Sequence, residues 1–283
     1  MQLLAVPNVS EGSDAAAIGA IADAFAPARV LDVHSDPDHG RSVFWRAAAQ
    51  GELADALVAG AREAARRIDL REHAGSHPYV GAIDVAPVVY LDESQRGAAA
   101  AEALTAAALL GDVLPVYLYG DLATRPEHRE RAALRAGGPR GLIERGATPD
   151  YGPAPDETSG AVLVTARPPL IAFNVDLETE DVELAKAIAA ELRESNGGRP
   201  GVRAIGLHLP HRSRAQVSFN VHDHRAAPLR ELVDEVKRRA PVAEAELVGL
   251  APAAALEGLE DVTTLRGFDP ARHVVENAFR SLT

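Results

Sequence analysis

The chain has 283 residues, of which 47% are hydrophobic and 25% charged, so it is a globular protein with a substantial core rather than a disordered one. Cysteine is absent, which excludes disulfides, thiolate metal sites and cysteine nucleophiles. The formal net charge of −12 argues against a nucleic-acid binder, because phosphate contacts need clustered Lys and Arg.

The N-terminus has no basic segment and only a short apolar run, so we expect a cytoplasmic protein without a signal peptide or membrane span. The first half then predicts the order β-α-β-β-α-β from apolar runs and helical spacing. The expected elements are a strand at 3–8, a helix between an N-cap at Ser13 and Pro27, strands at 29–34 and from Arg41, a helix at 52–68 and a strand at 82–91. Asp92 and Gln95 resemble a capping box for a helix ending near Leu110, and a strand at 115–120 follows.

The second half predicts the same order again. Its expected elements are a strand at 170–177, a helix at 180–193, strands at 201–209 and 214–221, a helix through 229–236 and a strand at 244–250. The offsets between the first three strands are about the same in both halves, roughly 30 and then a dozen residues, which indicates a duplication. We therefore predict an α+β (α/β) protein of two ferredoxin-like β-α-β-β-α-β subdomains.

The expected boundaries are an N-terminal subdomain at 1–150, a linker at 151–168 and a C-terminal subdomain at 169–283. The stretch at 135–160 is rich in Gly and Pro and is read as linker and loop. Ligands commonly bind between two such lobes, so a cleft or tunnel is expected there.

The stretch HAGSHPYVGAIDVAP, residues 73–87, carries two histidines four residues apart. On a helix such a pair would share a face and bind a metal, but Gly75 and Pro78 make a helix unfavourable. On a loop that enters a strand, an imidazole can be aimed into a cleft, where a pKa of about 6.5 suits proton transfer. His77 is therefore the candidate catalytic base. A surface or structural histidine is the alternative, and the residues alone leave it open.

A second dense group, His34, Asp36, Asp38 and His39, is also considered as a metal site. Asp-Pro-Asp-His-Gly is equally suitable for a hairpin turn, and such spacing is unspecific for metal binding. We expect no metal.

Many segments, in order, resemble one family. The segments are VPNVSEG, DPDHGRSVF, HAGSHPYVGAIDVAP, PVYLYG, PDYGP, ARPPLIAFNVDL, AIGLHL, AQVSFNV and LVGL, which cover the chain except for its last ~30 residues. The chain is thereby similar to the formiminotransferase domain family of glutamate formimidoyltransferase, which is found alone in bacteria and fused to a cyclodeaminase in animals.

The resemblance implies a transferase of one-carbon metabolism and histidine degradation. It would move the formimino group, or a formyl group, from N-formimino-L-glutamate to N5 of tetrahydrofolate. Tetrahydrofolate would be the co-substrate, with no metal. The resemblance also implies two similar α/β subdomains with folate in a tunnel between them, assembled as a homodimer, with no nucleic-acid or membrane partner.

The resemblance places the catalytic histidine at His77 and the matching aspartate at Asp84. The N5 amine must lose a proton as it attacks the formimino carbon, and the expelled glutamate nitrogen needs one back, so one imidazole serves both steps. Asp36, with Asp38 as the alternative, is the candidate to stabilise the nitrogen as it becomes cationic.

Further residues are candidates for substrate binding. Arg41 and Arg167 would hold carboxylates, because guanidinium fits carboxylate bidentately. A positive potential in the cleft is expected from Arg41, Arg46 or Arg167. The candidates for hydrogen bonds to folate are Asn8, Asn174, Gln216 and Asn220. Backbone capping is the open alternative for Asn8, Gln216 and Asn220.

The chain departs from the family at a few positions near the expected site. Tyr79 stands where arginine is common, Gly40 where asparagine is common, Thr165 where glycine is common, and Ser76 where animal members have glutamate. Tyr79 would stack on a pterin or fill space. The departures favour altered specificity, so two alternatives stay open: a folate- or pterin-binding protein without transfer activity, and a transferase with another amidine donor.

Overall fold

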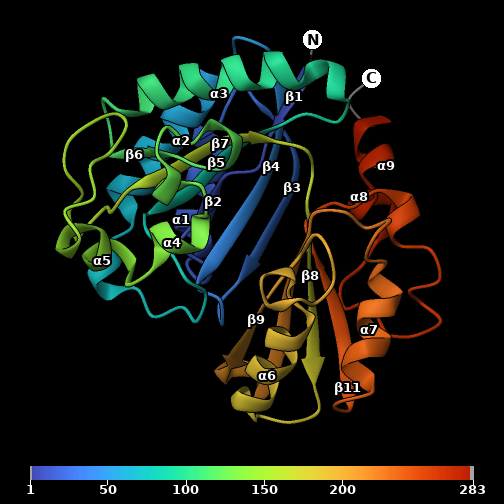
Figure 1. Cartoon of the computed structure of the whole chain (residues 1–283). Helices are drawn as coiled ribbons and strands as arrows, with labels where there is room; N and C mark the ends of the chain where they lie inside the picture. The colour runs from blue at the N-terminus through green and yellow to red at the C-terminus, as the bar shows by residue number, and fades with distance from the viewer. Residues whose placement is uncertain (1, 281–283) are drawn as a thin grey trace. The chain divides into compact units, whose positions relative to one another are not determined.

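The computed structural model describes residues 2–280 and divides the chain into two compact units, Met1–Pro169 and Leu170–Thr283 (Figure 1). Each unit has its own apolar core, one from residues of the first 166 positions and one from residue 171 onward. The two units are described separately below.

Unit 1 opens with the predicted β-α-β-β-α-β order. Its elements are β1 (Gln2–Ala5), β2 (Asn8–Val9), α1 (Ala15–Ala24), β3 (Arg29–Asp36), β4 (Arg41–Ala49), α2 (Leu53–Arg67) and β5 (Ile83–Val89). β1 and β2 form one interrupted strand that pairs antiparallel with both β4 and β5, and β3 pairs with the far edge of β4. This antiparallel order is that of a ferredoxin-like sheet, as predicted.

Two sequence-level details differ from the prediction. The first strand breaks after Ala5, where Pro7 cannot donate a ladder hydrogen bond. Helix α1 is capped by Asp14 rather than Ser13, because the carboxylate of Asp14 accepts hydrogen bonds from the amides of Ala16 and Ala17.

Unit 1 then extends this sheet beyond β5. The added helices and strands are α3 (Arg96–Leu110), β6 (Val116–Leu118), α4 (Arg131–Arg135), α5 (Gly138–Glu144) and β7 (Val162–Arg167). β7 runs parallel to both β5 and β6. The range 151–168, expected to be a linker, therefore contributes a buried strand to the sheet, and the expected loop at 135–160 contains α5.

The sheet of unit 1 is covered on both faces. Residues of α1, α2 and α3 pack on one face of the sheet, and together with it they form the larger apolar core of unit 1. Leu134 of α4 and Leu142 of α5 pack on the other face with Tyr117, Tyr119 and Leu163. Because side chains alternate along a strand, Tyr119 and Arg167 belong to this second face, together with α4.

Unit 2 repeats the ferredoxin-like order without an extension. Its elements are β8 (Ile171–Leu177), α6 (Val182–Leu192), β9 (Val202–Leu209), β10 (Arg214–Val221), α7 (Leu229–Lys237) and β11 (Val242–Val248), followed by α8 (Pro270–His273) and α9 (Val275–Arg280). The antiparallel order β11-β8-β10-β9 matches β5-β1/β2-β4-β3 of unit 1 strand for strand. The predicted duplication is therefore present in the topology.

The two faces of the β8–β11 sheet differ in character. Phe173, Val175 and Phe219 pack against α6 and α7, which lie together on one face (Figure 1). The alternate positions are polar, so Asn174 and Gln216 belong to the opposite face. None of the described helices has the length and apolar character needed to cross a bilayer.

Candidate active site

The loop that carries His77 is clamped to the turn between β3 and β4. The amide and the hydroxyl of Ser76 both donate to the carbonyl of Asp38, at 3.0 and 2.8 Å. The amide of His77 donates to the carbonyl of His39 at 3.4 Å. The imidazole rings of these two histidines lie 5.9 Å apart with an interplanar angle of 30°. The clamp thus brings together two histidines that are far apart in the sequence.

Glycines allow this close approach. Gly40 has a positive φ of 61°, and a Cβ there would lie 2.6 Å from the Cα of Gly75. A Cβ on Gly75 would lie 2.7 Å from the Cα of Gly40 and would also overlap the carbonyl oxygen of His39. Backbone atoms cannot yield as the end of a flexible side chain can, so both positions need glycine.

Replacing Gly75 with alanine should therefore separate the two loops. We expect a loss of about 1–3 kcal/mol in the free energy of unfolding, the usual cost of overpacking, and a fall in kcat because the His77 ring moves. Urea unfolding and turnover measure the two effects. The matched control is Gly97→Ala in α3, where an added Cβ meets no atom within 4 Å and alanine favours the helix. Equal behaviour of the two variants would contradict the clamp.

His77 is held in one tautomer. Its Nδ1 lies 2.8 Å from the carbonyl oxygen of Pro78, which can only accept, so Nδ1 carries the proton and Nε2 keeps its lone pair. The pKa of His77 is lowered well below 6.5. Burial is the largest cause, and the positive charges of Arg41 and Arg135 lower the pKa further. The imidazole is therefore neutral at pH 7, which is the form that accepts a proton.

His73 has a different environment. Its Nδ1 donates to the carbonyl of Ser10 at 3.1 Å, and its ring lies edge-on to Tyr79 with the centroids 4.2 Å apart. Burial lowers the pKa of His73. These contacts tie β2 to the histidine loop, which agrees with a supporting role for His73.

Asp84 is the centre of a buried charge network. Its carboxylate accepts a hydrogen bond from Arg41 at 2.7 Å and a bidentate pair from Arg135 of α4, and it also accepts the amide of Val80 at 3.0 Å. Arg41 in turn donates from Nε to the side-chain oxygen of Asn8 at 2.9 Å. Asp84 therefore fixes two guanidinium groups beside His77.

The charges in this network are retained despite burial. Burial raises the pKa of Asp84, but the guanidinium groups of Arg135 and Arg41 outweigh it, so the pKa is lower than usual and the group is a carboxylate. Burial lowers the pKa of Arg41 to about 10, which leaves it protonated at neutral pH. Asp84 consequently positions cations and is not available as an acid.

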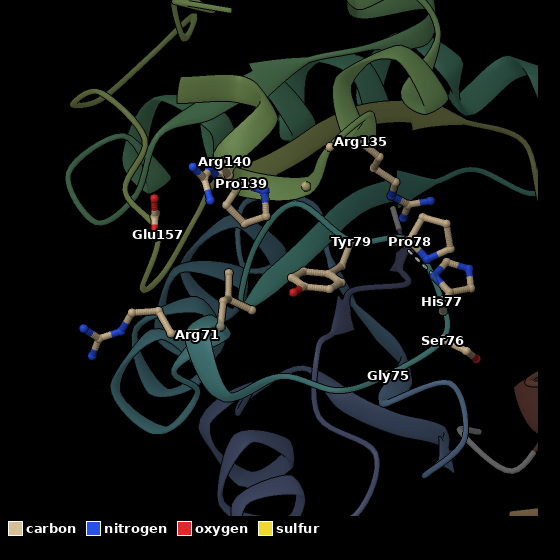
Figure 2. Close-up of a pocket in the computed structure, with 13 residues that line it drawn as sticks. Arg71, Gly75, Ser76, His77, Pro78, Tyr79, Arg135, Pro139, Arg140 and Glu157 are labelled. Carbon is tan, nitrogen blue, oxygen red and sulfur yellow. Dashed lines mark hydrogen bonds between the residues drawn. The ribbon is translucent and has the colours of Figure 1, made fainter. Parts of the chain in front are cut away.

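A pocket of about 470 Å³ adjoins this network (Figure 2). Tyr79 lies in the middle of the lining, with His77 and Arg135 toward one end and Arg71 and Glu157 toward the other. The lining combines an aromatic ring and prolines with several arginines, which suits a ligand that is partly flat and partly anionic.

The structure accounts for two of the departures from the family pattern. Gly40 and Ser76 both belong to the clamp between the loops, through the close backbone contact and the bonds to the carbonyl of Asp38. Tyr79 lines the pocket, and so does Ser76. Of these three positions, Tyr79 and Ser76 are therefore placed to contact a ligand.

The amide candidates of the second half share one sheet face in unit 2. Asn174 and Gln216 are 2% and 0% exposed, and the register places Asn220 on the same face. Gln216 donates to Asp176 at 2.7 Å, and Asn174 contacts Glu246 at 3.4 Å. These bonds arrange a polar face opposite α6 and α7.

Two other candidates have geometries that the sequence did not reveal. Asp36 is buried, and its Oδ1 accepts the amide of His39, so it supports the turn. Arg46 does not contribute to a positive cleft, because its guanidinium is buried against Phe25 and Phe44 in the core and donates to the carbonyl of Ala22. Within residues 2–280 no group of three or more His, Asp or Glu side chains is arranged to hold a metal.

Sequence reasoning missed Tyr119, Arg131 and Arg135, which lie on the same side of unit 1 as His77. Arg131 and Arg135 are the first and last residues of α4, a helix of five residues that is too short for a periodic signal. Their spacing of four is the sequence signal that places both on one helix face.

Comparisons with known proteins give one consistent result. A protein-family model described as the N-terminal subdomain of the formiminotransferase domain matches residues 2–167 of the sequence. A second family model, described as the formiminotransferase domain, matches residues 172–276. The glutamate formimidoyltransferase of Thermoplasma acidophilum is 35% identical over 282 residues, covering 93% of this chain and 93% of that protein. That of Streptococcus pyogenes serotype M1 is 35% identical over 288 residues, covering 96% of each. The formimidoyltransferase-cyclodeaminase of Rattus norvegicus is 36% identical over 89% of this chain, which spans half of that longer protein.

Proposed function

The chain belongs to the formiminotransferase domain family, and from this premise we propose that it transfers the formimino group of N-formimino-L-glutamate to N5 of tetrahydrofolate. The observation that supports this proposal for the chain is the protonation state and position of His77. It is a neutral imidazole with a free Nε2 lone pair, clamped beside two fixed arginines.

The reaction needs one proton to be moved twice. The donor amidine is a strong base and enters as the amidinium cation. As the N5 lone pair attacks the formimino carbon, the C=N π pair moves onto the amidinium nitrogen, His77 Nε2 takes the N5 proton, and a neutral tetrahedral intermediate forms. The bond from that carbon to the glutamate nitrogen then breaks, and the imidazolium returns its proton to the leaving nitrogen. His77 both takes the proton and returns it, so no second acid is required.

The surrounding residues have proposed supporting roles. Arg41 and Arg135, fixed by Asp84, keep His77 neutral and attract the substrate carboxylates. Asp36 is proposed to stabilise the positive charge of the formimino group before and after the intermediate. Tyr79, lining the pocket, is proposed to contact the flat pterin ring.

Further binding roles are proposed for residues of unit 2 and for Arg167. Asn174, Gln216 and Asn220 share a polar sheet face and are proposed to hydrogen-bond folate. Arg167, at the end of β7 in unit 1, is proposed to bind a carboxylate. A homodimer is proposed as well, as the resemblance in the sequence implies, and light scattering of the purified protein will test it.

The pH dependence of kcat/KM should report the lowered pKa of His77. Because the neutral imidazole is the active form, activity should persist through pH 6.5 and fall only at clearly lower pH, as the ring becomes protonated. Arg135→Gln removes one of the charges that lower this pKa, so its acid limb should move to higher pH.

The exposed Arg140 of α5 supplies the control, since its side chain pairs with Glu144 and is not among the main charges that lower the pKa of His77. Arg140→Gln should leave the limb in place. An acid limb at or above pH 6.5 in the unsubstituted protein, or one that Arg135→Gln leaves unmoved, contradicts the assignment of His77 as the base.

A further inference from the structure

Tyr119, Arg131 and Arg167 form a second polar group close to Asp84, in the part of unit 1 that extends the ferredoxin-like sheet. β6 and β7 are parallel, and the chain leaves both at the same edge. Tyr119 follows β6, and its backbone is joined to β7 by its amide to Val164 at 3.0 Å and by the hydroxyl of Thr165 to its carbonyl at 2.7 Å. Arg167 is the last residue of β7.

Helix α4 covers this edge. Leu134 packs against Tyr119, and Arg135 reaches Asp84 of β5, so the face of α4 that carries Arg131 and Arg135 is turned to the sheet. The charges of Arg131 and Arg167 act on each other, and both act with Tyr119. Three polar groups from β6, β7 and α4 therefore meet at the carboxyl ends of parallel strands, where open sheets commonly bind ligands.

Two of these groups hold a buried polar atom without a partner, although Nη1 of Arg167 donates to the carbonyl of Pro168 at 2.9 Å. The hydroxyl of Tyr119 and the Nε of Arg167 are inaccessible to solvent and have no hydrogen bond of good geometry within the described chain. The side chain of Arg131 is half-buried, and it makes no hydrogen bond or ion pair with any residue from 2 to 280. Burial and the neighbouring charge of Arg135 lower the pKa of Arg131 to about 9, which still leaves it cationic at pH 7.

The local charge is unbalanced. Among the described residues, the carboxylate that acts on Arg131 is Asp84, which Arg41 and Arg135 already share. Burying a cation without a counter-charge is costly, and native proteins retain such groups where a ligand completes them. The missing component is an anion with several acceptor lone pairs.

We propose that Tyr119, Arg131 and Arg167 form a binding subsite for a substrate carboxylate. Two guanidinium groups and a phenol hydroxyl supply donors to both oxygens of such a group, whereas a neutral ligand would leave the cations uncompensated. The inference rests on the proposed function for the identity of the ligand, since both substrates carry carboxylates. The carboxylate belongs either to the amino-acid donor or to the glutamate tail of folate.

Equilibrium binding to Arg131→Gln and Tyr119→Phe tests the subsite without requiring turnover. The probes are N-formyl-L-glutamate, a stable analogue of the donor, folinic acid, and the pteroate analogue of folinic acid that lacks the glutamate. Loss of a charge-assisted bond should weaken the affected probe about 10- to 100-fold for Arg131→Gln and less for Tyr119→Phe. Weaker N-formyl-L-glutamate assigns the donor carboxylate, and weaker folinic acid with unchanged pteroate assigns the folate tail.

A stability measurement separates a binding role from a structural one. Removing a half-buried cation that lies close to Arg135 and Arg167 should raise the Tm of the ligand-free Arg131→Gln variant, while the gain in Tm on adding the affected probe should disappear. Arg66→Gln, an exposed arginine of α2 paired with Glu63, is the control and should change neither quantity.

Unchanged affinity of Arg131→Gln for all three probes overturns the subsite, whatever the outcome for turnover. Wild-type protein that binds N-formyl-L-glutamate through Arg131 but transfers no formimino group overturns the proposed function and leaves the subsite standing. The two failures are therefore distinguishable.

Discussion

Replacing His77 with alanine should lower kcat about 10²- to 10⁴-fold, the usual contribution of a general acid–base residue, while folinic acid affinity stays within a few-fold. The reason is geometric as well as chemical. Nδ1 is fixed by the carbonyl of Pro78, and the clamp to His39 holds the ring, so the lone pair of Nε2 has a defined direction. Steady-state kinetics and isothermal titration measure the two quantities.

His73→Ala is the matched comparison, because it removes an imidazole from the same loop. His73 donates to Ser10 and packs on Tyr79, so its loss should destabilise the loop and cost much less turnover. If the two alanine variants lose equal turnover, or if His77→Ala keeps full activity, another group carries the proton.

Asp84→Asn should be the most destabilising conservative substitution in the site. The fully buried carboxylate is the counter-charge of Arg41 and Arg135, and removing one partner of a buried network costs about 3–5 kcal/mol. We also expect a large loss of activity, because both guanidinium groups lose their fixed position. Urea unfolding followed by circular dichroism measures the free energy.

Asp69→Asn provides the contrast, since Asp69 is half-exposed and its partner Arg71 is solvated. This variant should have no resolvable change in stability, as expected for surface pairs. An Asp84→Asn protein as stable and active as Asp69→Asn would show that the network neither supports the fold nor positions the arginines.

The sequence predicted the fold because the relevant signals are local. Apolar alternation and helical spacing located the ferredoxin-like strands and the helices between them, and the repeated offsets predicted the duplication that the two sheets display. The wrong details lie where local signals are weak. β7 follows a Gly- and Pro-rich stretch and was assigned to a linker, although its parallel pairing with β5 buries it.

The site was only partly predictable for a related reason. Asn174, Gln216 and Asn220 could be placed on strands, and the register then set them on one face. The contact of Arg135 with Asp84 spans 51 residues and depends on a five-residue helix, so no periodic pattern precedes it. The expected contribution of Arg46 to a positive cleft is absent because its guanidinium lies over two aromatic rings in the core. The sequence alone does not distinguish such an arginine from any other charged residue of a strand.

The most direct test is to incubate the protein with N-formimino-L-glutamate and tetrahydrofolate and to follow 5-formiminotetrahydrofolate by mass spectrometry. We predict transfer by the unsubstituted protein and its near-complete loss in His77→Ala, with folinic acid binding retained in both. Tight binding of folinic acid by the unsubstituted protein without any transfer would contradict this account and identify a folate-binding protein instead.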